Sequence, residues 1–170
     1  MVMEAAATLI LRDDILFSRK ISSTDAILLR IESAFCLLNS ERVMLYKEVI
    51  TAVDFRRLFG TVQIRQPRGS GLTTAAVLML YAMDDAIVFV VSQQDSMHIK
   101  NVIHRMLHIP YGVRENMMGR VYFSSHLNPA LYDTVMPAII ILDRASNFQT
   151  VDYNRIFSEF FDTTLIVELQ

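Results

Sequence analysis

The 170-residue sequence has no tryptophan and contains one cysteine, four prolines and five glycines. A single cysteine, Cys36, excludes an internal disulfide, so the fold must depend on a hydrophobic core. Cys36 falls within an apolar helical pattern, and we expect it to be a small buried thiol in a reducing, intracellular environment. Because no Pro-, Gly- or Ser-rich linker interrupts the chain, the sequence predicts one domain over residues 1–170.

The sequence also lacks an excess of either charge. Its 16 Lys and Arg residues nearly balance its 18 Asp and Glu residues, so no overall positive field attracts nucleic acid. A contact with nucleic acid must then be local, and the candidate residues are Arg56 and Arg57 in the segment DFRRLFG. The alternative is that the stems of these arginines cover apolar surface. The content of 52% hydrophobic and 20% charged residues excludes disorder and favours a sheet with covered faces.

No hydrophobic run is long enough to cross a membrane. The longest runs, AAVLMLYAM and AIVFVV, are well short of the roughly 20 residues that a spanning helix needs. The N-terminal segment has Glu4 before its apolar stretch and Arg12 soon after it, unlike a signal peptide. We therefore expect no membrane association and a cytoplasmic location.

The first 60 residues predict a mostly helical lead-in. From Ser22, apolar residues recur at helical spacing, and Ser22 and Asp25 are spaced as a capping pair. A second helix is predicted over residues 40–60, with an apolar face that includes Val49 and Val53.

After Gly60, short β-branched runs alternate with helical stretches, which predicts an α/β core over residues 61–170. Runs such as AIVFVV are apolar at every position, as strands buried on both faces require. The sequence therefore predicts a three-layer fold, with helices on both faces of a mostly parallel sheet of about five strands. The expected strands are TVQIR, AIVFVV, RVYFSS, AIIILD and TTLIVEL, and the expected helices start near Gly71, Gln94 and Asp152. Residues 109–120, punctuated by proline and glycine, predict an irregular loop.

The segment QPRGSGLTTAAVLMLY, residues 66–81, lies between a predicted strand and a predicted helix. A phosphate-binding loop has this setting, because a glycine-rich turn lets backbone N–H groups face an anion at a helix N-terminus. When the pattern G-x-x-x-x-G-K-[ST] is aligned on Gly71, Gln66 occupies the first glycine position and Leu72 the lysine position. Thr73 occupies the hydroxyl position that holds Mg²⁺.

Leucine at the lysine position removes a cation from the β- and γ-phosphates. Arg65 and Arg68 flank the turn, and each is a candidate substitute because a guanidinium binds phosphate in a bidentate manner. The alternative is that both arginines are solvated or contact nucleic-acid backbone. The candidate cofactor-binding residues are Arg65, Gln66, Arg68, Gly69, Ser70, Gly71, Thr73 and Thr74.

A second candidate segment, PAIIILDRAS, places Asp143 at the carboxyl end of a predicted strand, where open α/β sheets bind their ligands. Asp143 and Thr73 are therefore the candidate Mg²⁺ ligands. An ATPase usually follows this aspartate with a glutamate that polarises the attacking water, whereas Arg144 follows it here. The sequence accordingly predicts no catalytic residue.

Four segments follow one another in a recognisable order: RQPRGSGLTTAAVLMLYAM with the strand AIVFVV and the polar run SQQD, then RVYFSS, then PAIIILDRASNF, and finally TTLIVELQ. This order resembles the ATPase core of viral large terminases, such as those of phages, and of related helicases, over about residues 40–170. The resemblance implies a degenerate P-loop NTPase in which Leu72 and Arg144 depart from the family pattern. It also implies a role in DNA packaging, without the nuclease domain of that family.

Two other constellations predict no site. His104 and His108 are four residues apart on a predicted helix, but no third ligand stands at a convincing position, so a solvated or capping role is preferred to a metal site. Ser70 lies in the sequence GSG and not in the G-x-S-x-G elbow of a hydrolase.

Two functions from different classes follow. The first is a catalytically degenerate pseudo-ATPase that acts as a binding or scaffold module for a protein partner, in viral DNA packaging or another nucleic-acid-handling assembly. It would lie in the host cytoplasm and have no tightly bound cofactor. The alternative is a module that binds ATP or ADP with Mg²⁺ and uses Arg65 or Arg68 in place of the lysine. The terminal segment TTLIVELQ is a candidate sheet edge for homo-oligomer formation.

Overall fold

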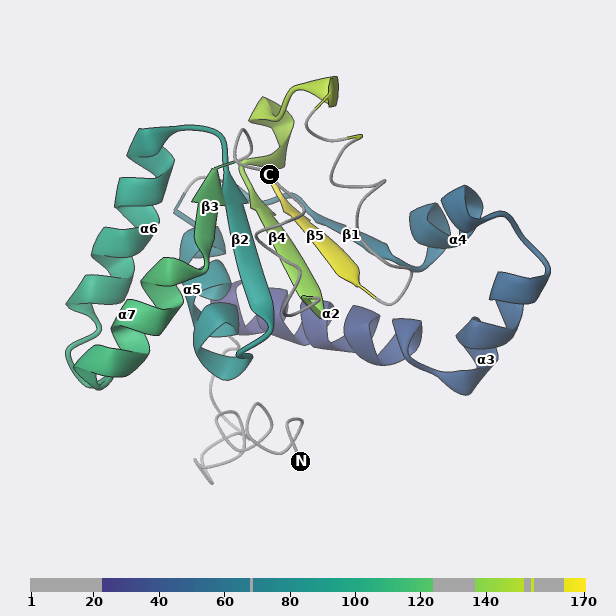
Figure 1. Cartoon of the computed structure of the whole chain (residues 1–170), viewed down its shortest axis with the longest axis horizontal. Coiled ribbons are helices and arrows are strands. Elements are labelled where there is room, and N and C mark those ends of the chain that lie inside the picture. The colour runs from purple at the N-terminus through teal and green to yellow at the C-terminus, as the bar shows by residue number, and fades with distance from the viewer. Residues whose placement is uncertain (1–22, 68, 124–136, 152–153, 155–163) are drawn as a thin grey trace.

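A five-stranded parallel sheet forms the centre of the protein (Figure 1). The structure is a computed structural model that describes residues 23–67, 69–123, 137–151, 154 and 164–170. The strand order is β1-β5-β4-β2-β3, and every neighbouring pair is parallel. The strands are β1 (Thr61–Ile64), β2 (Ala86–Val90), β3 (Val121–Phe123), β4 (Ile139–Asp143) and β5 (Leu165–Leu169). The predicted α/β class with a parallel sheet of five strands is confirmed, and each strand lies within a predicted segment.

The three inner strands, β2, β4 and β5, are buried at every position. Their sequences, AIVFV, IIILD and LIVEL, are apolar on both faces of the strand, which allows both faces of the sheet to be covered. The expectation that these uninterrupted apolar runs form strands buried on both faces is confirmed.

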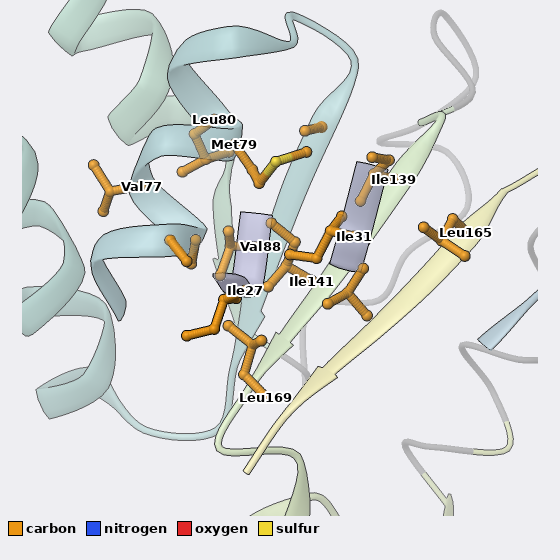
Figure 2. Close-up of a cluster of buried hydrophobic side chains, with 14 of the residues drawn as sticks. Ile27, Ile31, Val77, Met79, Leu80, Val88, Ile139, Ile141, Leu165 and Leu169 are labelled. Carbon is orange, nitrogen blue, oxygen red and sulfur yellow. The ribbon is translucent and has the colours of Figure 1, made fainter. Parts of the chain in front are cut away.

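Four helices cover one face of the sheet: α2 (Ser23–Leu38), α5 (Leu72–Ala82), α6 (Gln93–Arg105) and α7 (Tyr111–Gly119). Figure 2 shows Ile27 and Ile31 of α2 reaching towards Val88 and Ile141 of the sheet. Because α2 also packs on α5, the lead-in belongs to the same hydrophobic core as the α/β part of the chain. The opposite face has its own buried cluster, made by Ile87, Phe89, Ile140, Leu142, Ala145 and Ile166.

The prediction of one continuous helix over residues 40–60 is wrong. The chain forms α3 (Glu41–Met44), the 3-10 turn η1 (Leu45–Glu48) and α4 (Ala52–Leu58). The break arises because Thr51 starts a new helix, with its hydroxyl accepting a hydrogen bond from the Asp54 N–H at 3.1 Å. Val49 and Val53, expected on one apolar face, are 80% and 74% exposed.

Two further expectations are corrected. Residues 109–120 were expected to be irregular, but α7 occupies most of this segment, because Pro110 precedes the helix and does not interrupt it. Cys36 was expected to be buried, but it is exposed, because it lies on α2 away from the face that carries Ile27, Ile31 and Leu38. The capping residue Ser22 and the predicted helix near Asp152 lie outside the described residues.

Within the described part of the chain, no helix has the length and apolar character needed to span a bilayer.

Candidate functional site

A cleft of about 610 Å³ lies at the carboxyl edge of the sheet. Its walls come from the loop after β1, the first turn of α5, the N-terminal half of α6, and the ends of β4 and β5 with the turn that follows β4. Ligands bind at this edge in open α/β sheets. The lining residues are Gln66, Pro67, Gly69, Ser70, Gly71, Leu72, Thr73, Thr74, His98, Asp143, Arg144, Ser146, Asn147, Leu169 and Gln170.

The loop after β1 has a backbone that depends on glycine at two positions. Gly69 has φ +82° and Gly71 has φ +93°, both in the left-handed region that L side chains rarely adopt. At Gly71 a side chain would also collide with α2, because a Cβ there would lie 2.1 Å from Thr24 Oγ1. Glycine is therefore required at Gly71 by both backbone conformation and space.

Helix α2 supports this loop from behind. The Ser23 hydroxyl donates a hydrogen bond to the carbonyl oxygen of Ser70 at 2.5 Å, across 47 residues of sequence. The lead-in thus fixes the shape of the loop as well as covering the sheet. The sequence contained no sign of this contact, because it joins two segments that local patterns treat separately.

Helix α5 follows this loop directly, and the first turn of α5 lines the cleft. Gly71 is the N-cap residue and offers no side chain to the N–H groups of that turn. Such N–H groups have no partner within the helix, and the helix dipole adds partial positive charge. Ser70 Oγ is buried and has no hydrogen-bond partner among the described residues. This side of the cleft therefore offers donors, as an anion-binding site does.

Asp143 stands on the opposite side of the cleft, at the end of β4. It is 4% exposed, and burial raises the pKa of its carboxyl above the ordinary value. The negative charge of Asp95 also raises this pKa, whereas Arg144 and His98 lower it. A cation bound beside this carboxylate would offset the cost of ionising it in a buried position.

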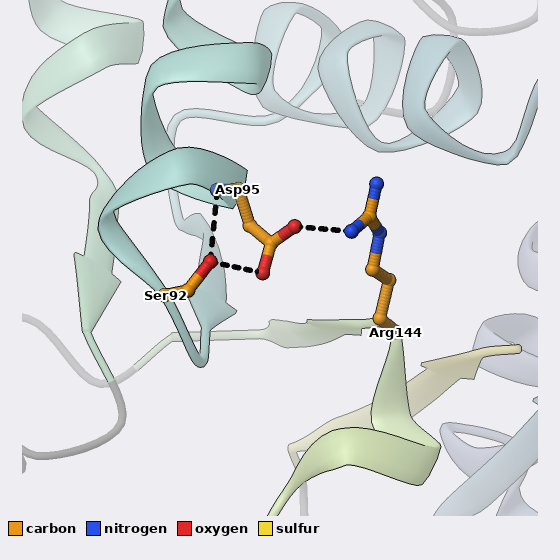
Figure 3. A network of polar contacts seen from close by, with 3 residues as sticks. All are labelled: Ser92, Asp95 and Arg144. Atoms are coloured by element: carbon orange, nitrogen blue, oxygen red, sulfur yellow. Dashed lines mark hydrogen bonds and ion pairs between the residues drawn. The ribbon is translucent and has the colours of Figure 1, made fainter.

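Arg144 follows Asp143 in a left-handed conformation, with φ 56° and ψ 53°. Its Nη1 lies 2.6 Å from Oδ1 of Asp95, in the first turn of α6 (Figure 3). The second carboxylate oxygen of Asp95 accepts a hydrogen bond from the Ser92 hydroxyl at 2.6 Å. The Ser92 hydroxyl also accepts a hydrogen bond from the Asp95 N–H at 3.1 Å, so a helix cap holds the partner of Arg144.

The structure brings most of the predicted site residues together. Gln66, Gly69, Ser70, Gly71, Thr73, Thr74 and Asp143 all line the cleft. Leu72 lines it too, and also packs against the hydrophobic core. Arg65 is exposed, does not belong to the cleft lining, and acts electrostatically on Glu168. Arg68 lies outside the described residues.

Other candidates lie elsewhere. Arg56 and Arg57 belong to α4, which packs beside β1. His104 and His108 are exposed towards the end of α6 and after it. The described residues contain no group of three or more His, Cys, Asp or Glu that could hold a metal by themselves. A metal at Thr73 and Asp143 would therefore need oxygen ligands from a bound phosphate or from water.

Sequence patterns missed four polar residues of the cleft: His98, Ser146, Asn147 and Gln170. His98 comes from α6, and the other three follow the ends of β4 and β5. Ser146 and Asn147 could have been found as residues that follow the predicted aspartate. His98 and Gln170 carried no such signal, because their place depends on the order of the strands.

No family model matches this chain, and no curated protein matches it. The structure thus shows the fold class, and the relation to terminases stays a prediction.

Proposed function

We propose that the protein is a catalytically degenerate P-loop-like module, whose cleft binds the phosphates of a nucleotide such as ADP or ATP with Mg²⁺ but does not hydrolyse it efficiently. One observation supports this most strongly. The glycine-dependent loop, the uncapped first turn of α5 and the buried Asp143 carboxylate line one cleft.

Each part has a role in such a site. The N–H groups around Gly69, Ser70 and Gly71 would surround a phosphate, and the Ser70 hydroxyl, which has no partner among the described residues, would gain one. Thr73 and Asp143 would help to hold Mg²⁺, which prefers oxygen ligands and usually shares them with substrate phosphates. Bound Mg²⁺ would neutralise charge on the phosphates.

Two features argue against efficient hydrolysis. Leu72, at the lysine position, contributes apolar surface to the core and no charge to the cleft. Arg144 follows Asp143 at the position where an ATPase usually has a glutamate that polarises the attacking water, and it pairs with Asp95. Loss of a buried charge contact costs on the order of 2 to 5 kcal/mol, which is about 30-fold to several-thousand-fold in affinity. We therefore expect weak binding.

A second candidate function is a scaffold that binds a protein partner, within viral DNA packaging or another nucleic-acid-handling assembly. It is favoured by exposed apolar residues on α3, η1 and α4. Isolated exposed apolar residues are common, but several on neighbouring helices are typical of an interaction surface. The set consists of Met44, Leu45, Tyr46, Val49, Val53 and Leu58. Both functions are compatible in one protein.

The test is a nuclear magnetic resonance titration of the full chain with MgADP and MgATP up to millimolar concentrations. We expect the backbone amide signals of residues 69–74 to shift, and ATP turnover to stay at the level of buffer. The variant Leu72→Lys should bind more tightly, whereas Leu72→Met, which restores no charge, should bind as the wild type does. Unchanged amide signals in the wild-type protein would refute phosphate binding, whether or not Leu72→Lys folds.

A further inference from the structure

The basic residues that the structure describes on the walls of the cleft do not include Arg65, one of the two arginines that the loop sequence suggests. Among the described residues that line the cleft, the basic side chains are Arg144 and His98. Arg65 lies outside the lining and near Glu168. Of the two cleft residues, Arg144 carries a guanidinium, whose planar fork of N–H donors matches the oxygens of a phosphate.

Arg144 is held by an ion pair with Asp95, and its guanidinium is nevertheless accessible. Its side chain is 58% exposed, whereas that of Asp95, its partner, is 7% exposed. The carboxylate therefore lies in the wall, and the guanidinium lies at the surface of the cleft. The contact joins one nitrogen, Nη1, to one carboxylate oxygen. A guanidinium carries five N–H donors in a planar fork, so this contact leaves donors for a second anion.

Asp95 is well placed to orient Arg144. Its two carboxylate oxygens have separate partners, Arg144 Nη1 for Oδ1 and the Ser92 hydroxyl for Oδ2. Figure 3 shows the carboxylate of Asp95 between the Ser92 hydroxyl and the guanidinium of Arg144. Because Ser92 also caps α6, the carboxylate has little freedom to turn away. A pre-oriented guanidinium loses less entropy when it binds phosphate.

We propose that Arg144 supplies, from the β4 side of the cleft, the positive charge that Leu72 cannot supply from the loop side. Its ligand is the phosphoryl group of the nucleotide, and Asp95 is the residue that positions it. This inference rests on the proposed function, since it assigns the cation of the same site. It also assigns the compensating role to Arg144 in place of Arg65, which does not line the cleft, whereas Arg68 lies outside the described residues.

The assignment has a consequence that a structural ion pair would not have. Asp95 both orients Arg144 and cancels part of its charge. The variant Asp95→Asn keeps an oxygen that can accept the guanidinium hydrogen bond but removes the competing negative charge. Ligand affinity should then rise severalfold, while removal of Arg144 lowers it. A pair that served stability alone would give no such opposite signs.

The experiment is calorimetric titration of MgADP and inorganic pyrophosphate into the full chain and four variants. Arg144→Ala should weaken binding about 10-fold, the usual effect of losing a charge-assisted hydrogen bond. Arg144→Lys should recover part of that loss, and Asp95→Asn should bind more tightly than wild type. Arg105→Ala removes an exposed arginine at the far end of α6 and should leave the affinity unchanged.

The outcomes separate the two proposals. If wild type binds neither probe, the proposed function fails, and this inference fails with it. If wild type binds and Arg144→Ala binds equally well, the site exists and only the role of Arg144 is overturned. Circular dichroism of each variant confirms folding. Because Asp95→Asn is expected to gain affinity, a loss of structure in that variant cannot imitate the expected result.

Discussion

The two ends of the parallel sheet differ in whether their polar groups have hydrogen-bond partners. At the carboxyl end, Gly69, Gly71 and Arg144 have positive φ, Ser70 Oγ is buried with no hydrogen-bond partner among the described residues, and Asp143 is a buried carboxyl with a raised pKa. At the amino end, a single arginine satisfies the backbone. The Arg120 guanidinium donates to the carbonyl oxygens of Leu80, Met83 and Ala86.

Arg120 donates hydrogen bonds to carbonyl oxygens at the end of α5 and just after it. The last turn of α5 contains no basic residue, and its carbonyls lie next to the start of β2. Arg120, just before β3, reaches these carbonyls from about 40 residues further along the chain. Burial lowers the pKa of Arg120, and the neighbouring Asp84 and Asp85 oppose that shift.

The difference between the two ends of the sheet indicates which end contains groups that lower the stability of the fold. Strained backbone and unsatisfied polar groups are unfavourable, and they persist in proteins mostly where a ligand uses them. At the amino end, the hydrogen bonds of Arg120 to three carbonyl oxygens serve stability. The carboxyl end retains unfavourable features, of which a bound phosphate would give Ser70 Oγ a partner and a bound Mg²⁺ would offset the charge of Asp143.

The largest expected effect is at the amino end. Arg120→Met removes the donors for three carbonyls and should lower the free energy of unfolding by about 2 to 3 kcal/mol, measured by urea denaturation. The control Arg105→Met, an exposed arginine on α6, should change it by less than about 0.5 kcal/mol. Equal stability of the two variants would contradict the structural role of Arg120.

The next effect is at the loop. Gly71→Ala places a Cβ at positive φ and against Thr24, and should cost about 1 to 3 kcal/mol of unfolding free energy. Adding Thr24→Ala should recover only part of this, since the backbone strain remains. The control is Gly119→Ala, where a Cβ meets nothing within 4 Å and a gain of up to about 1 kcal/mol is expected in a helix. A Gly71→Ala variant as stable as wild type would show that the loop tolerates a side chain.

Substitution of Asp143 should raise the free energy of unfolding, unlike the substitutions of Arg120 and Gly71. Asp143→Asn removes a buried charge and should raise the free energy of unfolding near neutral pH by about 1 kcal/mol, while phosphate binding loses its dependence on Mg²⁺. Thermal denaturation with and without MgADP measures both. A less stable Asp143→Asn variant would mean that the carboxylate contributes to the fold and that the comparison of the two ends fails.

The pH dependence sharpens this prediction. Because the pKa of Asp143 is raised in the folded protein, the native state keeps that proton to higher pH than the unfolded chain. The stabilisation of the folded state that comes from this bound proton is complete below the ordinary carboxyl pKa. It is lost as the pH rises through the pKa of Asp143 in the folded protein. The advantage of Asp143→Asn should therefore shrink on acidification.

The groups that face Asp143 set the size of this effect. Arg144, Asp95 and His98 act on it, so the variant should be compared with wild type at each pH. Glu168, whose pKa burial also raises, contributes with the same sign in both proteins. An advantage that grows towards acid would contradict the raised pKa of Asp143.

The smallest expected effect is at Ser70. Ser70→Ala removes a buried hydroxyl that has no partner among the described residues, so the free energy of unfolding should change by less than about 0.5 kcal/mol. Phosphate affinity should nevertheless fall severalfold, measured by the same titration as for Arg144. Ser33→Ala, a change at an exposed serine of α2, should alter neither quantity. An unchanged affinity in Ser70→Ala would remove this hydroxyl from the site.

Sequence patterns predicted much of the fold and part of the site. Strands such as AIVFV and IIILD were predictable because burial on both faces leaves an uninterrupted apolar run. Gly71 and Asp143 were found because a glycine before a helix and an acid after a strand are local signals. The break at Thr51 was missed because the apolar spacing of residues 40–60 continued past a residue that caps a helix.

The sequence by itself determined the α/β class, the segments that form strands, and the uncharged residue Leu72 after Gly71, because these depend on neighbouring residues along the chain. Only the tertiary structure decided which residues share the cleft. The strand order β1-β5-β4-β2-β3 places β5 between the loop strand and the strand of Asp143. The contacts of Thr24 with Gly71, of Ser23 with Ser70 and of Arg144 with Asp95 join distant segments. Packing of those elements on one core creates these contacts, and no local pattern encodes them.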